Sequence, residues 1–178
     1  MVGLARIRWY LAFQPVLCRS GEGYRRPVTK LLLSIHVIAA ILAVGPVAVA
    51  ASRFPAATRR ALAGDDRAVS ELRTLHRICR IYAVLGVAVP AFGFATAQSL
   101  GVLGDIWLII SIALTACAAG VLALLVLPGQ QRTLAAVTAS DADPKAPAQL
   151  AMHAGIFNLL WATVTVLMIV RPGSTTGV

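Results

Sequence analysis

Long apolar stretches alternate with short polar segments along this chain. The apolar stretches cover residues 31–51, 78–97, 106–127 and 150–170. Each is roughly 20 residues long, which is the length that a helix needs to cross a hydrocarbon core. Backbone groups in lipid must pair within the segment, and short connections make consecutive spans antiparallel neighbours. The sequence therefore predicts an all-α fold, an integral membrane up-down four-helix bundle.

Prolines, glycines and aspartates mark where these spans should end or bend. Pro55 is expected to close the first span, and Pro128 with Gly129 the third. Asp65 and Asp66 are suited to cap the helix that leads into the second span. Pro90 should kink the second span, because proline removes a backbone hydrogen bond. The small residues Gly45, Gly86, Gly93 and Gly120 are expected to allow close helix packing.

Composition supports a membrane domain. Hydrophobic residues make up 58% of the 178 residues, and the mean hydropathy is +0.80. We divide the chain into a basic N-terminal segment 1–30, a four-span domain 31–171 and a short tail 172–178. For the segment 1–30 two interpretations stay open: an interfacial basic helix, or native translation that starts at Val28.

The net charge of +9 comes from basic residues that flank the spans. This placement indicates contact with anionic lipid and not with nucleic acid. Loops 52–77 and 128–149 together carry more Lys and Arg than the other side, so the positive-inside rule places both in the cytoplasm. The high content of Ala, Val and Arg is typical of a bacterial protein, so we expect the bacterial plasma (inner) membrane.

Residues that could carry chemistry are few. The central turns of the spans contain no charged side chain, and the chain has no phosphate loop, HExxH motif or nucleophile elbow. We therefore expect no enzyme and no catalytic residue. Asn158 in the fourth span is expected to make a hydrogen bond to a neighbouring helix.

The histidines allow two interpretations. His36 in the first span is either hydrogen-bonded to a neighbouring helix or a cofactor ligand. His76, Cys79 and His153 offer N, S and N ligands suited to copper or zinc, if the second and fourth spans bring them to one level. Otherwise the two histidines face headgroups and Cys79 packs.

Arg73, Arg77 and Arg80 share one helix face with His76 at the predicted membrane surface. This face either meets lipid headgroups or docks a partner.

Residues 31–40, from Leu31 to Ala40 with His36 among them, and the following Val44-Gly45-Pro46 resemble the first helix of a bacterial family of small integral membrane proteins of unknown function. That family is distantly similar to the copper-resistance D-like four-helix membrane proteins and to the four-helix haem protein of protoporphyrinogen oxidation. The resemblance covers about residues 29–172. It implies the four-helix fold and a haem or copper role for His36.

Three functions are consistent with the sequence. The first is a non-enzymatic accessory or assembly protein that binds membrane lipid and a membrane-protein partner, or forms a homo-oligomer. The second is a haem- or copper-binding membrane protein. The third is a small transporter or channel, which would need a water-lined cavity within the bundle.

Overall fold

The computed structural model describes the backbone of residues 3–173 and the side chains of residues 27–173. This part of the chain contains helices and no strand. The elements are α1 (Gly3–Leu62), α2 (Asp66–Leu85), α3 (Ala88–Leu100), α4 (Ile106–Gly120), the π-helical segment η1 (Val121–Val126), α5 (Leu127–Thr138) and α6 (Ala146–Val170).

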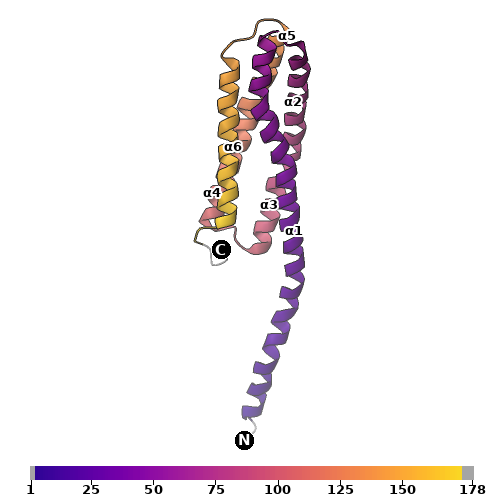
Figure 1. Cartoon of the computed structure of the whole chain (residues 1–178). Helices are drawn as coiled ribbons and strands as arrows, with labels where there is room; N and C mark the ends of the chain where they lie inside the picture. The colour runs from indigo at the N-terminus through magenta and orange to yellow at the C-terminus, as the bar shows by residue number, and fades with distance from the viewer. Residues whose placement is uncertain (1–2, 174–178) are drawn as a thin grey trace.

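These elements make four rods, because α2 leads into α3, and α4 leads through η1 into α5 (Figure 1). Each rod is long and apolar enough to cross a membrane. The predicted all-α fold with four long apolar helices is therefore confirmed. The α1–α2 turn and the α5–α6 loop lie at one end of the bundle, here called the upper end. The α3–α4 loop and the end of α6 lie at the lower end (Figure 1).

Within the predicted loops 52–77 and 128–149, residues 52–62 and 128–138 are wrong as loops, because both stretches are helical. Residues 66–77 belong to the helix that the caps at Asp65 and Asp66 predicted. α1 continues through Pro55 to Leu62, and α5 continues beyond Pro128 to Thr138. The true connections are residues 63–65 and 139–145. The rods therefore extend at the upper end by several turns beyond their most apolar stretches.

Packing explains why Pro55 does not end α1. A proline inside a helix costs about 3 kcal/mol. Phe54 and Ala57 on either side of it are fully buried, and burying one Phe side chain stabilises by roughly 1.5–3 kcal/mol. Thr58 is also buried, and its hydroxyl donates to the Phe54 carbonyl at 3.0 Å. Burial of this segment outweighs the loss of one backbone hydrogen bond.

The π-helical segment explains why Pro128 does not end the third rod. The Leu127 N–H donates to the carbonyl of Leu122, five residues back. This wider turn directly precedes Pro128, which has no N–H to contribute to a regular helix. Gly129 then allows close contact with α6, because a Cβ there would lie 2.9 Å from Leu150 Cδ2.

Other local predictions hold. Asp65 caps α2, and its carboxylate accepts from the Arg67 N–H at 3.0 Å. The second rod is interrupted at Gly86 and Val87, just before Pro90, where proline leaves a carbonyl without its helical donor.

The four glycines that were expected to allow close packing differ in what surrounds them. Gly93 packs closely, because a Cβ there would lie 2.8 Å from His36 Cε1. For Gly45 and Gly120 the packing prediction is wrong, because a Cβ at either position would meet nothing within 4 Å. Gly86 would meet only carbonyls of its own preceding turn.

Candidate functional site

A buried polar chain joins α2 to α5 in the upper half. The Gln130 side-chain oxygen lies 3.2 Å from His76 Nδ1, and its NH₂ group donates to Cys79 Sγ at 3.5 Å. Gln130 and Cys79 are both 0% exposed. Gln130 is not among the residues that the sequence singles out, although a polar residue directly after Pro128 and Gly129 is a signal for a special position.

His153 does not join this chain. It is half-buried on α6, and its Nδ1 is buried with no hydrogen-bond partner. Among the residues with described side chains, no three His, Cys, Asp or Glu come together in a group that could hold a metal ion. The structure thus links His76 and Cys79 through Gln130 and leaves His153 apart from them.

Asn158 connects α6 to α1. Its NH₂ group donates to Ser52 Oγ at 2.9 Å, which confirms the predicted interhelical hydrogen bond. The Asn158 side-chain oxygen is buried and has no partner. Ser52 was not singled out from the sequence, because a serine near the end of an apolar stretch carries no specific signal.

His36 lies in the lower half, on the side of α1 that faces α3. Its Nδ1 is 2.9 Å from the carbonyl oxygen of Val89, and its ring rests on Gly93. The hydrogen bond to a neighbouring helix that the sequence favoured is confirmed. A cofactor role for His36 stays a prediction.

Arg73, Arg77 and Arg80 are exposed on α2. The opposite face of this helix is buried, through Ala68, Leu72, Leu75 and Cys79. Two other arginines, Arg53 and Arg60 of α1, pair with Glu71 and so fasten the end of α1 to α2. The exposed arginine face is free to meet headgroups or a partner, and either role stays a prediction.

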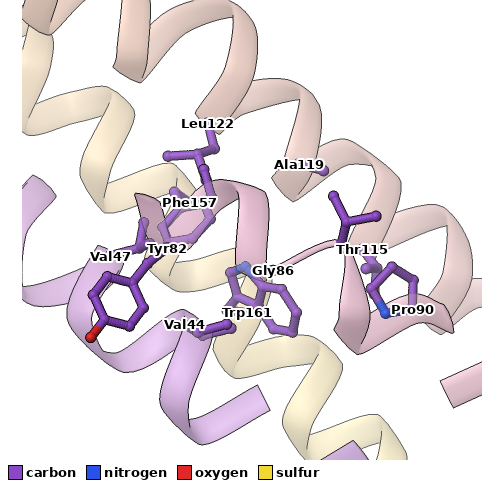
Figure 2. A pocket seen from close by; sticks show the side chains of 13 residues that line it. Val44, Val47, Tyr82, Gly86, Pro90, Thr115, Ala119, Leu122, Phe157 and Trp161 are labelled. Atoms are coloured by element: carbon purple, nitrogen blue, oxygen red, sulfur yellow. The ribbon is translucent and has the colours of Figure 1, made fainter. Parts of the chain in front are cut away.

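A cavity of about 150 Å³ lies where the four rods meet (Figure 2). Its walls are almost wholly apolar and come from every rod: Ala43, Val44, Val47, Tyr82, Ala83, Gly86, Val87, Pro90, Thr115, Ala119, Leu122, Phe157 and Trp161. The hydroxyl of Thr115 donates to the Ser111 carbonyl at 2.7 Å, so it is already paired. Val87 is 68% exposed, which shows that the cavity opens to the outside of the bundle.

Below the cavity the bundle divides into two helix pairs. α1 contacts α3, and α4 contacts α6, whereas α3 and α4 hardly contact each other. Within the described part of α1, no residue before Ala43 is buried. The pairs rejoin at the lower end in a small cluster around Ala97, Trp107 and Leu108.

The helix irregularities lie in the cavity walls. The α2–α3 interruption supplies Gly86, Val87 and Pro90, and the π-helical segment supplies Leu122. The sequence predicted the bend at Pro90 but not the cavity, because a cavity depends on how four rods are placed together.

The basic segment 1–30 lies mostly outside the described side chains, which begin at Pro27. Comparison with protein-family models, with curated proteins and with solved structures finds no match.

Proposed function

We propose that this chain is a non-enzymatic, multi-pass protein of a bacterial inner membrane. It acts as an accessory protein by holding an apolar group of another bilayer molecule in the cavity. The upper end lies in the cytoplasm. The four apolar rods support the membrane location, since their lengths and compositions suit a bilayer.

The charge distribution supports this orientation. The upper end carries most of the described basic residues: Arg53, Arg59, Arg60, Arg67, Arg73, Arg77, Arg80, Arg132 and Lys145. At the lower end the described basic residues are Lys30 and Arg171. Cytoplasmic ends of membrane proteins carry such an excess of Lys and Arg.

The cavity is the observation that carries the proposed function. Its apolar lining favours an apolar ligand over a hydrophilic substrate or an ion. Its volume of about 150 Å³ suits one aliphatic chain or ring, since an apolar protein cavity of about this size binds benzene. A partner helix, at about 10–12 Å in diameter, is too wide for it.

Fluorescence of Trp161 tests the proposal, because this side chain lines the cavity. A short bromoalkane is titrated into the detergent-solubilised full chain, and the Trp161 signal is obtained as the difference from Trp161→Phe. We expect a saturable quenching component, because a site fills whereas partition into the micelle does not. Ala119→Phe, which fills the cavity, should remove that component, and Ala116→Phe, an exposed position outside the cavity walls, should keep it. Quenching that never saturates in the wild type would overturn the proposal.

A metal-binding role is the second candidate, and one observation favours it. His153 Nδ1 is buried without a hydrogen-bond partner, a state that a bound cation or water would relieve. Metal analysis and an optical spectrum of protein purified from its native membrane test this candidate. Copper or a Soret band that is lost in His153→Gln or in His36→Gln would support it, and a metal-free protein without visible absorption would end it.

A further inference from the structure

The cavity opens to the outside of the bundle just above the part where the two helix pairs separate. Its walls include Val87 and Pro90, which are exposed on the outside of the bundle. Arg171 follows Trp161 by ten residues, which is about 15 Å along a helix. An extended aliphatic chain of about this length, with one end in the cavity, would therefore reach the lower end of the bundle.

Arg171 is held in a fixed position at this end. Its Nε donates to the Met168 carbonyl at 3.2 Å, and its guanidinium lies 5.6 Å from the ring centroid of Trp107. The indole N–H of Trp107 in turn donates to the Asp105 carboxylate at 2.8 Å. A guanidinium that is already ordered loses little freedom when it binds a phosphate, for which its planar donors are well suited.

The charge of the lower end is also suited to an anion. Lys30 of α1 is exposed. The contacts of His36 with α3 set the register between α1 and α3, and this register places Lys30 level with the end of α3. The Asp105 carboxylate is the described acidic group at this end, and it accepts from Trp107. The two cations Lys30 and Arg171 therefore stand on different helix pairs at the lower end.

We propose that the cavity and Arg171 together form a site for one anionic phospholipid. Its acyl chain occupies the cavity, and its phosphate binds the Arg171 guanidinium, with Lys30 adding attraction from the opposite pair. This inference rests on the proposed function, because it names the bilayer molecule whose apolar group the cavity holds.

Native mass spectrometry tests the inference on the full chain. The protein is reconstituted in an equimolar mixture of phosphatidylglycerol and phosphatidylcholine with identical acyl chains, extracted in mild detergent, and its retained lipids are identified. We expect one retained lipid, with phosphatidylglycerol favoured about five-fold, as one basic residue at a membrane surface would give. Arg171→Gln should reduce the preference to the smaller part that Lys30 contributes and keep a lipid bound. Ala119→Phe should lose the lipid, and the matched control Ala116→Phe should retain it.

Each failure has its own meaning. Retention of both lipids in equal amounts by the wild type would overturn the anionic site and leave the apolar cavity site standing. A preference that is unchanged in Arg171→Gln would also overturn it, and so would retention of a free fatty acid in place of a phospholipid. Equal lipid retention by Ala119→Phe and the wild type would overturn the inference and the proposed function together. The melting temperature of each variant shows whether its fold is intact.

Discussion

The upper and lower halves of this bundle are built from the same kind of apolar helix but differ in how these helices pack. In the upper half, large side chains such as Phe54, Leu72 and Phe157 are fully buried, and all four rods share one core. In the lower half the rods form two pairs that separate below the cavity, and none of the described α1 side chains before Ala43 is fully buried. The difference predicts that most of the stability comes from the upper half, and it agrees with the proposed binding role of the lower half.

Phe54→Ala should produce the largest loss, because it opens a void in the shared core. We expect a decrease of about 3–5 kcal/mol in the free energy of unfolding. Val87→Ala, at an exposed position of the cavity wall, should change it by no more than about 0.5 kcal/mol. Denaturation with SDS in mixed micelles measures both variants. Equal losses of unfolding free energy in the two variants would contradict the difference between the halves, because stability would then be shared evenly between them.

Gly93→Ala tests a close contact within the lower α1–α3 pair. The added Cβ would lie 2.8 Å from His36 Cε1, so the imidazole must move and weaken its bond to Val89. Overpacking of this kind costs roughly 1–3 kcal/mol. Gly45→Ala is the matched control, since its Cβ would meet nothing within 4 Å. Thermal melts should show a lower melting temperature for Gly93→Ala and not for Gly45→Ala. Equal melting temperatures of the two variants would refute a role for this contact.

Gln130→Leu tests the polar chain of the upper half. It leaves His76 Nδ1 and the Cys79 thiol without their partner, and a buried polar group without a partner costs about 1–3 kcal/mol. The neighbouring Gln131 is exposed, so Gln131→Leu should leave the unfolding free energy nearly unchanged. The two variants are compared by SDS denaturation. A neutral Gln130→Leu would show that the chain of hydrogen bonds adds nothing to the stability of this half.

The sequence predicts the apolar stretches well, because a bilayer imposes a length and a composition that can be counted along the chain. The four stretches and the cap at Asp65 illustrate this, since each depends on residues close together in sequence. Pro55 and Pro128 were interpreted as helix ends from local propensity alone. Burial around Phe54 overrides the first, and the wider π-helical turn before Pro128 accommodates the second.

The candidate site could be predicted only in parts. His36 and Asn158 were expected to bond to neighbouring helices, because a polar group within an apolar rod needs a partner. Their partners, Val89 and Ser52, are separated from them by 53 and 106 residues, and no local pattern identifies them. The cavity has the same limit, since its walls come from every rod.

The hydrogen bond between Asn158 and Ser52 should have the smallest effect, even though it joins α6 to α1 in the stable half. Interhelical hydrogen bonds in membrane proteins contribute about 0.6 kcal/mol on average. The Asn158 side-chain oxygen is buried without a partner, so removing the side chain also relieves a cost. We therefore expect Asn158→Ala to be close to neutral and Ser52→Ala to destabilise slightly. A double-mutant cycle measured by SDS denaturation isolates the coupling between the two side chains. A coupling well above 1 kcal/mol would mean that polar contacts, as well as the apolar core, hold the upper half together.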